Sequence, residues 1–401
     1  MTTEQQPRPY PFSEPDRLEL DAAYAQIRAE GGLARVQCPY GTPALLATRY
    51  EDVKLVLGDP RFSRARAVAG DQPAHTPIGP GPDAMVSMDP PDHTRLRRVV
   101  AKAFTMRRIE QLRPRVQQII EDLLDAMQAQ GRPVDLVAEF ARPQPALVIF
   151  ELFGVPAQDR KQLQEWAETT LTATGDRYTL QDVFQALDSL RAYMADLLQE
   201  RRRKPADDLL SVLVAARDEE DRLSEKELLD LATGVLITGY ETTADQISNF
   251  AYLLLTRPDH LRQLRADPEL IPQAVEEMLR FVPLLRGTSF PRIATEDVLL
   301  SGGLVRAGEA VLPAMMSANR DEAIFTDPDE LDFHREHNPH FGFGHGVHRC
   351  LGAQLAKMEL QIALGALLRR FPHLRLAVPA EEVPWRVVTL QRAPRELLIT
   401  W

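Results

Sequence analysis

One long helical pattern constrains the fold of this chain more than any other feature of its sequence. It begins at Ser224, where Ser-Glu-Lys-Glu offers a capping box, and it continues to about Thr256. Arg257-Pro258 ends it, because proline cannot continue a helix and restricts the residue before it. About 32 residues at 1.5 Å each span roughly 48 Å. This predicts one long central helix that crosses the molecule.

The middle of this pattern is unusual for a helix interior. It reads VLITGYETTAD, so that glycine, threonine and glutamate interrupt an otherwise apolar stretch. Glycine weakens a helix, and threonine side chains compete for its backbone hydrogen bonds. These residues are poor choices for a packed interior, and this part of the helix is therefore a candidate functional segment.

Helical periodicity dominates the rest of the chain, which predicts a mainly α fold with small peripheral β-sheets. Apolar residues recur at three- and four-residue spacing over about residues 91–131, 140–172, 179–203 and 206–217. Short β-like runs lie near the two ends of the chain, at Leu33–Gln37, Ala44–Thr48, Val298–Leu300, Val311–Pro313 and Leu397–Thr400. The stretch from Gly58 to Pro91 is rich in Gly and Pro without periodicity, and we expect a loop that covers the substrate.

Domain organisation follows from length and from the absence of repeats. The chain has 401 residues, more than the roughly 250–300 at which one hydrophobic core usually stops growing. No internal repeat or Gly/Ser-rich linker divides it. We therefore expect a flexible N-terminal arm over residues 1–15 and a single domain over residues 16–401, built around a cofactor.

Composition and charge exclude several classes of protein. The formal net charge is −11, with both signs interspersed, which argues against nucleic acid as a partner. No apolar run approaches the roughly 18–20 residues that span a bilayer, and the first residues do not resemble a signal peptide. Two cysteines, Cys38 and Cys350, fit a reducing compartment. We expect a cytoplasmic monomer, in which the basic run Arg201–Lys204 is a solvated helix end.

The segment around Cys350 carries the strongest chemical signal. Residues 343–352 read FGHGVHRCLG and precede an amphipathic helix, so a glycine-containing turn delivers the cysteine to a helix N-terminus. The helix dipole favours a thiolate there, and a haem iron that must cleave an O–O bond needs such a ligand. Two other readings remain: a small buried cysteine, or a zinc site with the histidines at 334, 337, 340, 345 and 348.

This segment resembles the haem-binding loop of the cytochrome P450 family, F-G-x-G-x-H-x-C-x-G, at every fixed position. The resemblance implies the family's fold, with a b-type haem between the long central helix and the helix after the cysteine. Cys350 would be the axial ligand of the iron, and Phe343 would pack near its sulfur. Gly344 and Gly346 would make the turn, and Gly352 would let the helix approach the haem.

Three further motifs occur in the family's order along the chain. AVEEMLRF contains Glu277 and Arg280, which resemble a buried pair that locks the scaffold together with Arg335. MDPPDHTRLRR places His93 and Arg97 on one helix face, as in the family's haem-propionate contacts. Arg292 and His348 would supply the other cationic or N–H donors that two propionate carboxylates require.

The unusual helix segment resembles the family's oxygen-activating motif. In TGYETT, Glu241 and Thr242 would be the acid and the alcohol that deliver protons to dioxygen. Thr238 departs from the family's pattern, which has Ala or Gly there. A branched polar side chain at that position would narrow the pocket over the haem.

Comparison with the family also places the substrate contacts. We expect them in the loop around residues 66–88, in the region of about residues 165–190, and at single positions that are mostly apolar or small, which suggests a sizeable hydrophobic substrate. These positions are Met85, Val86, Leu236, Thr238, Gly239, Leu285 and Thr389. Arg286 is the exception, and it would face solvent, a propionate or a polar group of the substrate.

The resemblance implies a monooxygenase that inserts one atom of O2 into a small molecule, by hydroxylation or epoxidation. The segments ATEDV, NRDEAIF and GAQLAKMEL look most like the actinobacterial branch that tailors macrolides, polyketides and other secondary metabolites. The alternatives are a haem-thiolate enzyme of non-oxygenating chemistry (oxidative coupling, dehydration or isomerisation) and a haem-based sensor or carrier.

The chain has no flavin or dinucleotide fingerprint and no iron–sulfur cysteine set, so its electrons must come from a partner. We expect a ferredoxin and a ferredoxin reductase that uses NAD(P)H. An acidic ferredoxin would dock on a basic patch formed by Arg107, Arg108, Arg349 and Lys357.

Overall fold

The computed structural model describes residues 6–14, 16–76, 79–171, 178–218, 223–288, 290–386 and 390–401. The chain divides into two compact units. The first comprises residues 1–94, 273–350 and 390–392, and the second comprises residues 95–272, 351–389 and 393–401. Each unit is assembled from segments that lie far apart in the sequence.

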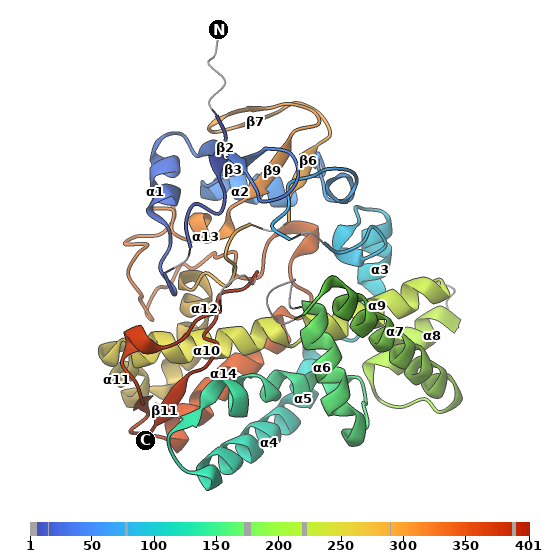
Figure 1. The fold of residues 1–401 in the computed structure, drawn as a ribbon, viewed down its shortest axis with the longest axis vertical. Coiled ribbons are helices and arrows are strands. Elements are labelled where there is room, and N and C mark those ends of the chain that lie inside the picture. The colour runs from blue at the N-terminus through green and yellow to red at the C-terminus, as the bar shows by residue number, and fades with distance from the viewer. Residues whose placement is uncertain are drawn as a thin grey trace. The chain divides into compact units, whose positions relative to one another are not determined.

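The first unit is built on a mixed sheet (Figure 1). Among the described residues, six strands form this sheet in the order β1-β2-β3-β9-β6-β4, and β7 pairs with β8 in a separate hairpin. The elements of this unit are β1 (Arg8–Pro9), α1 (Ala22–Ala29), β2 (Leu33–Gln37), β3 (Ala44–Ala47), α2 (Tyr50–Gly58), β4 (Phe62–Ser63), η1 (Ala65–Val68), η2 (Met85–Ser87), α12 (Ile271–Phe281, which begins in the second unit), β6 (Arg292–Ala294), β7 (Val298–Leu300), β8 (Gly303–Val305), β9 (Ala310–Pro313), α13 (Met315–Ala318) and η6 (Gly346–His348).

Apolar residues cover both faces of this sheet, as β3 illustrates. Successive side chains of a strand point to opposite faces. Ala47 packs with Val53 and Val56 of α2 on one face, whereas Leu46 packs with Tyr24 and Ile27 of α1 on the other. A strand that is buried on both sides can be apolar at every position, which explains the uninterrupted run of β3.

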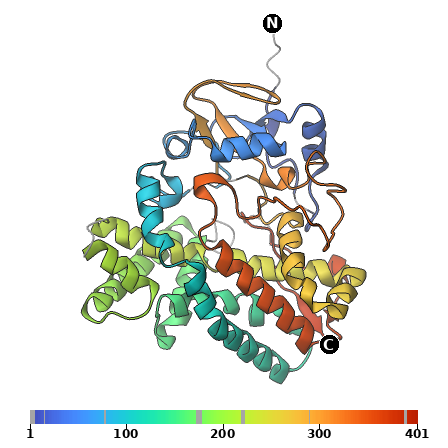
Figure 2. The same ribbon diagram turned by 180° about the vertical axis from the view of Figure 1, so that it is seen from behind.

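The second unit is mainly helical (Figures 1 and 2). Helix α10 packs against α14 and α5, and α4 packs against α14 and α5. Its elements are α3 (Asp92–Ala101, which begins in the first unit), α4 (Met106–Gln130), β5 (Val134–Asp135), the π-helix η3 (Val137–Ala141), α5 (Pro143–Leu152), η4 (Ala157–Asp159), α6 (Arg160–Leu171), α7 (Leu180–Arg203), α8 (Leu209–Asp218), α9 (Glu225–Thr238), α10 (Glu241–Leu255), α11 (Pro258–Ala266), η5 (Pro268–Leu270), α14 (Ala353–Arg370), β10 (Arg375–Leu376), η7 (Ala380–Glu382) and β11 (Leu398–Thr400).

The start of α9 follows the predicted capping box. The Ser224 side chain accepts a hydrogen bond from the Glu227 N–H, and the Glu227 carboxylate accepts one from the Ser224 N–H. Arg95 of α3 also binds Glu227, at 2.5 Å. This hydrogen bond is the main reason that the pKa of Glu227 is lowered to about 2. Helix α9 therefore begins at a charge-stabilised cap.

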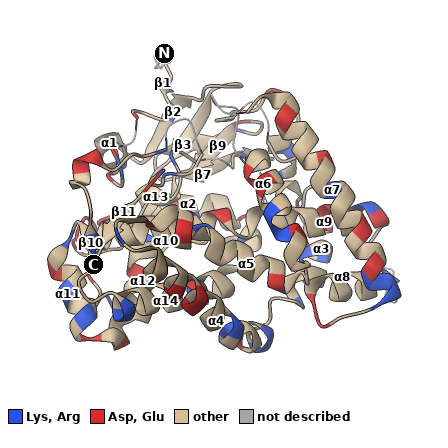
Figure 3. Ribbon diagram, turned by 60° about the horizontal axis from the view of Figure 1, so that its bottom comes forward, with Lys and Arg blue, Asp and Glu red and all other residues tan. Residues whose placement is uncertain are grey.

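The basic run at the end of α7 is held by acids of the same unit. Arg201 is buried and pairs with Asp208, and Arg202 pairs with the exposed Glu225 at 2.6 Å. Figure 3 shows acidic and basic residues interspersed along the helices. Arg201 of this run is therefore part of a buried ion pair. The sequence had predicted only a solvated helix end, and that prediction is wrong for Arg201.

The prediction of one continuous helix from Ser224 to Thr256 is wrong in one respect. The pattern forms two helices, because α9 ends at Thr238 and α10 begins at Glu241. A Cβ on Gly239 would lie 2.7 Å from a side-chain carbon of Ile149 in α5 and 2.7 Å from the Val235 carbonyl oxygen. Helix α5 therefore approaches the chain closely at the point where the helix breaks.

The mainly α fold class with small sheets is confirmed, and each of the five expected strands is present. The helical patterns at 91–131 and 140–172 each divide into shorter helices. The prediction of a single domain over residues 16–401 stays a prediction. Within the described residues, no helix combines the length and the apolar character that crossing a membrane requires.

Candidate active site

The loop before Cys350 has a defined shape in the first unit. Gly344 and Gly346 adopt φ values of 70° and 69°, a region that favours glycine. A Cβ on Gly346 would lie 2.4 Å from the Leu57 carbonyl oxygen, so only glycine fits against the end of α2. The Cys350 N–H donates to the Phe343 carbonyl oxygen at 2.8 Å and closes the turn.

This turn presents the Cys350 side chain ahead of a helix N-terminus. Cys350 is exposed, whereas Cys38 is buried, and burial raises the pKa of the Cys38 thiol to about 12. Gly352 caps α14, and its carbonyl oxygen accepts the Ala356 N–H at 2.9 Å. Of the two thiols, Cys350 is the one that an external partner can reach.

Two buried guanidinium groups lie in the same unit. Arg64 and Arg292 are 3% and 4% exposed, and their guanidinium groups donate to the backbone carbonyl oxygens of Val86, Phe290 and Pro291. Burial lowers the pKa of each to about 10, and repulsion by Arg292 contributes for Arg64. In the described residues neither guanidinium forms an ion pair with a carboxylate. Buried charges are normally paired, so this pair calls for an anion.

Two imidazoles accompany these cations. The rings of His93 and His348 lie 4.3 Å apart, and His93 is 1% exposed. Arg97 is half-buried and follows His93 by one helical turn in α3. A group with two carboxylates at the edge of an apolar ring, such as haem, fits this set of donors, because it supplies the anions that Arg64 and Arg292 require.

The zinc alternative gains no geometric support. Across the described ranges, no three or more His, Cys, Asp and Glu side chains gather in a way that could hold a metal ion. His340 instead binds Glu276, at 3.0 Å. The histidines before Cys350 therefore do not form a ligand set with it.

Glu277, Arg280 and Arg335 form one buried network in the first unit. The Arg280 side chain contacts Glu277 at 2.7 Å, and Arg335 contacts the same carboxylate at 3.2 Å. Arg280 also donates to the carbonyl oxygens of Asn319, Pro328 and Glu330. The network ties α12 to the loop after α13, which leads toward Cys350.

The acid and the alcohol of the TGYETT segment lie on the first turn of α10 in the second unit. Glu241 and Thr242 are both half-buried. Glu241 faces Arg386, with 3.3 Å between the Glu241 Oε1 and Arg386 Nη1 atoms. Burial raises the pKa of Glu241, and Arg386 and Arg142 oppose that shift. A carboxyl group that holds its proton more tightly than usual is suited to act as an acid near neutral pH.

The expected substrate contacts fall in both units. Met85 and Val86 form η2 of the first unit, where Leu285 also bridges to Gln391. Leu236, Thr238 and Gly239 lie at the end of α9 in the second unit. Leu236 is fully buried, whereas Thr238 is exposed and donates to the Gly234 carbonyl oxygen at 2.8 Å. Thr389 lies outside the described residues. Substrate contact at these positions stays a prediction.

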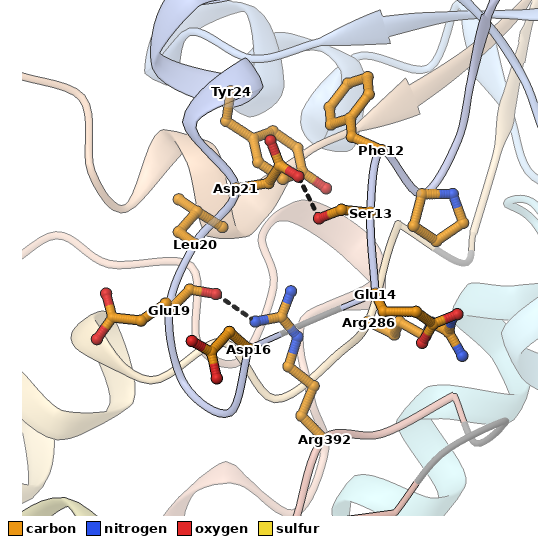
Figure 4. Close-up of a pocket in the computed structure, with 11 residues that line it drawn as sticks. Phe12, Ser13, Glu14, Asp16, Glu19, Leu20, Asp21, Tyr24, Arg286 and Arg392 are labelled. Carbon is orange, nitrogen blue, oxygen red and sulfur yellow. Dashed lines mark hydrogen bonds and ion pairs between the residues drawn. The ribbon is translucent and has the colours of Figure 1, made fainter. Parts of the chain in front are cut away.

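A cavity of about 130 Å³ lies elsewhere in the first unit, beside the N-terminal segment (Figure 4). Arg286 lines it and pairs with Glu14, and Arg392 donates to the Glu19 carbonyl oxygen at 2.7 Å. No expected haem contact lines this cavity. Arg286 faces an acid of its own chain.

Sequence reasoning did not identify three charged residues: Arg64 of the buried guanidinium pair, and Asp245 and Arg386, which form an ion pair beside Glu241. Arg64 lies in the irregular stretch between Gly58 and Pro91, Asp245 is a helix residue, and Arg386 lies in a segment without periodicity. The only signal in the sequence was the spacing of Glu241 and Asp245, four residues apart on one helix face.

Comparison with known proteins identifies a matching family and similar proteins. The model of the cytochrome P450 family matches residues 36–397. The chain is 52% identical over 395 residues to the nocardicin C N-oxygenase of Nocardia uniformis subsp. tsuyamanensis, covering 98% of each chain. It is 50% identical over 401 residues to the mycinamicin IV hydroxylase/epoxidase of Micromonospora griseorubida, covering all of both chains.

The fold is also that of solved structures. The crystal structure of cytochrome P450mel 107F1 with biaryl coupling reactivity superimposes with a TM-score of 0.93 at 44% identity, covering 99% of this chain and 100% of that one. The similarity to all three proteins therefore extends over both compact units.

Proposed function

Since this chain belongs to the cytochrome P450 family, we propose that it is a haem-thiolate monooxygenase that inserts one oxygen atom of O2 into a hydrophobic small molecule, by hydroxylation or epoxidation. The substrate is a secondary metabolite of polyketide, macrolide or similar type. The N-oxygenase relative extends the possible acceptor atoms from carbon to nitrogen.

The observation that carries this proposal is the exposed thiol of Cys350, which follows a glycine turn in the first unit. The same unit buries two guanidinium groups that pair with no carboxylate among the described residues. Haem, when bound, supplies a thiolate-ligated iron that activates O2 with electrons from outside. Cys350 would be the ligand, and Phe343, Gly344 and Gly352 would shape the chain around it. His93, Arg97, Arg292 and His348 would hold the propionates, and Arg64 would join them.

Glu241 and Thr242 control the protons of the reaction. Oxygen activation consumes protons, and a buried acid can supply them while a nearby hydroxyl positions the water that carries them. Glu241 fits the first role because its proton is held more tightly than usual. Thr242 fits the second because its side chain is half-buried on the same helical turn.

Substrate selection is assigned to the predicted contacts, which are mostly apolar. Met85, Val86, Leu236, Leu285 and Gly239 offer no charge, and Thr238 and Thr389 offer hydroxyl groups. Such a lining favours a large apolar molecule with few polar anchors. The relatives named for nocardicin C and mycinamicin IV support a natural product as substrate.

Electrons are assigned to a ferredoxin and its NAD(P)H-dependent reductase, which dock through the basic residues that the resemblance to the family indicates. Arg349 is exposed next to the cysteine. In the second unit, Arg107 is exposed near the start of α4, Arg108 pairs with Asp207 at 3.8 Å, and Lys357 lies on α14. We propose that each of these four cations contacts an acidic partner.

A second candidate function is oxidative coupling, in which no oxygen atom is inserted. It is favoured by the biaryl coupling reactivity of the structure that is 44% identical to this chain. The Glu241–Thr242 pair favours monooxygenation, since coupling requires no oxygen insertion. The two functions predict different results for a Thr242 variant: only monooxygenation predicts that reductant is diverted from product to hydrogen peroxide.

Thr242→Ala tests the proposal. The variant should bind haem and substrate but misplace protons, so that reductant is still consumed while product falls and hydrogen peroxide rises. We expect product formed per reductant oxidised to fall on the order of 10- to 100-fold, about 1.4–2.7 kcal/mol of barrier. Glu241→Gln should instead slow the whole reaction, because it removes a proton supply.

Thr243→Ala is the matched control, since Thr243 is the next residue of α10 and its side chain is buried. It should leave both the product ratio and the peroxide yield as in the unmodified protein. Unchanged product and peroxide in Thr242→Ala would contradict oxygen insertion controlled by this hydroxyl, and the coupling function would take its place.

A further inference from the structure

A second carboxyl group shares the cation that faces Glu241. Asp245 lies one turn further along α10, and its two oxygens approach Arg386 at 3.3 Å and 3.1 Å. The same guanidinium approaches Glu241 at 3.3 Å. The side chains of Asp245, Arg386 and Glu241 are 1%, 9% and 14% exposed. Two acids and one guanidinium therefore form a compact cluster that is largely closed to solvent.

The charges of this cluster do not balance if both acids are ionised. One guanidinium neutralises one carboxylate, and a second buried carboxylate would leave a net negative charge. The surroundings offer little compensation, because Arg142 lies beside Glu168, with 3.9 Å between their charged atoms, and Tyr240 is a neutral neighbour. One proton, carried by either of the two carboxyl groups, removes the imbalance.

The hydrogen bonds of Glu241 agree with a bound proton. Its Oε1 atom faces Arg386, whereas its Oε2 atom is buried and has no hydrogen-bond partner among the described residues. A carboxylate gains stability from donors to both oxygens, and a buried oxygen without a donor favours the neutral form. The proton of the neutral acid would thus lie on Oε2.

Backbone hydrogen bonds hold the segment of chain that carries Arg386. Its N–H donates to the Ala393 carbonyl oxygen at 3.0 Å, and the Arg395 N–H donates to the Pro384 carbonyl oxygen at 2.7 Å. The neighbouring Trp385 ring meets the edge of Tyr252 in α10, with ring centroids 5.1 Å apart. The guanidinium is therefore placed by a paired segment of chain that packs against the helix carrying both acids.

We propose that Asp245 and Arg386 are positioning residues that set how readily Glu241 releases its proton, through one proton that the two carboxyl groups share. This deepens the proposed function and rests on it, since the role of Glu241 as the acid belongs to that function. The pairing itself is a property of the folded chain and can be measured without turnover.

The directions of the pKa shifts agree with this geometry. Burial raises the pKa of Asp245 to about 7; Arg386 opposes the shift, and repulsion by Glu241 adds to it. Burial also raises the pKa of Glu241, against the pull of Arg386 and Arg142. Each carboxyl group thus depends on the charge of the other, and the pair titrates as a unit.

Infrared titration of the haem-containing protein tests the proposal. The carboxylic-acid C=O band reports protonated acids, and ¹³C labelling of glutamate separates Glu241 from Asp245. All variants would be made in a Glu359→Gln background, because Glu359 is another fully buried acid of the same unit, with a pKa raised to about 8 by burial. Its band would otherwise overlap that of Glu241.

Asp245→Asn should leave Glu241 alone with Arg386, so that the band of Glu241 disappears at a pH lower by about one unit or more. Arg386→Gln should move the loss of both bands to higher pH, and Arg386→Lys, which keeps the charge, should move it less. If Asp245→Asn does not fold, the two Arg386 variants make the same comparison. A Glu241 band that titrates at the same pH in the parent, Asp245→Asn and Arg386→Gln proteins would overturn the proposal.

The pH profile of product formed per reductant oxidised should move in the same direction as the infrared titration in Asp245→Asn. A profile that stays fixed while the infrared titration moves would overturn the link to proton release. Failure of the proposed function is recognised separately, because it appears as unchanged product and peroxide in Thr242→Ala.

Discussion

At the scale of single residues, Glu359 shows how a buried ionisable side chain affects the stability of the fold. It lies in α14, is fully buried and accepts a hydrogen bond from Gln144 at 2.8 Å. Burial raises its pKa to about 8, while the hydrogen bond from Gln144 opposes this. An unfolded glutamate has a pKa of about 4.3. The folded state therefore holds a proton that the unfolded state has lost between these two values.

Stability linked to Glu359 should fall as pH rises. Its contribution is fully present below the pKa of the unfolded state and is lost progressively as pH approaches about 8. Glu359→Gln removes this dependence, so Tm of the variant relative to the parent should be higher at pH 9 than at pH 5. Melting curves of both proteins across this range check the sign. Parallel pH dependences would contradict the assignment.

The turn before Cys350 could be predicted because the family motif that the sequence resembles has glycine at fixed positions in it. Gly344 and Gly346 do adopt the positive φ angles expected of the turn. Arg64, Asp245 and Arg386 could not be predicted, because a charged residue in a sequence indicates an exposed position unless its partner is known. Arg64 contacts the Pro291 carbonyl oxygen and Arg386 contacts Asp245, in segments of the chain that no local pattern connects.

At the scale of elements, the junction of α9 and α10 separates the acid–alcohol pair from the helix before it. Thr238 ends α9 with its hydroxyl bonded to the Gly234 carbonyl oxygen, and Glu241 begins α10. Periodicity predicted one helix because both halves present apolar residues at the same spacing. Only the approach of Ile149 to Gly239, a tertiary contact, marks the break.

Two glycine variants test the cause of the break. Gly239→Ala would force a Cβ against Ile149 and the Val235 carbonyl oxygen, and should destabilise the fold by about 1–3 kcal/mol. Gly234→Ala is the matched control, because it lies inside α9 and its Cβ would meet no described atom within 4 Å apart from its chain neighbours and the backbone of its own helix. It should be neutral or stabilise the helix by about 0.5–1 kcal/mol. Equal losses in denaturant unfolding of the two variants would refute the close approach as the cause.

Short strands mark the limit of sequence patterns at this scale. Strands β2 and β7 have the predicted bounds, and β3, β9 and β11 each differ from them by one residue at one end. Strands β4 and β6 have two and three residues and went unpredicted. A strand that short shows no alternation, and its position depends on the strand beside it. The covering role expected for the stretch between Gly58 and Pro91 stays a prediction.

At the scale of the whole molecule, two compact units each combine distant parts of the chain. The Cys350 loop folds in the unit that contains His93 and Arg292, and Glu241 folds in the unit that contains Arg386. The order of motifs along the chain could be read from the sequence. Which segments fold together could not, because long-range packing leaves no local periodicity.

The central claim, that this chain binds haem through the thiolate of Cys350, is tested by the spectrum of the reduced protein with carbon monoxide. The chain has two cysteines, and Cys38 is buried with a pKa raised to about 12, so Cys38→Ser is the matched control. The parent protein and Cys38→Ser should both show the strongly red-shifted Soret band of a thiolate ligand, and Cys350→Ser should lose it. Retention of that band in Cys350→Ser, or its loss in Cys38→Ser, would contradict the account.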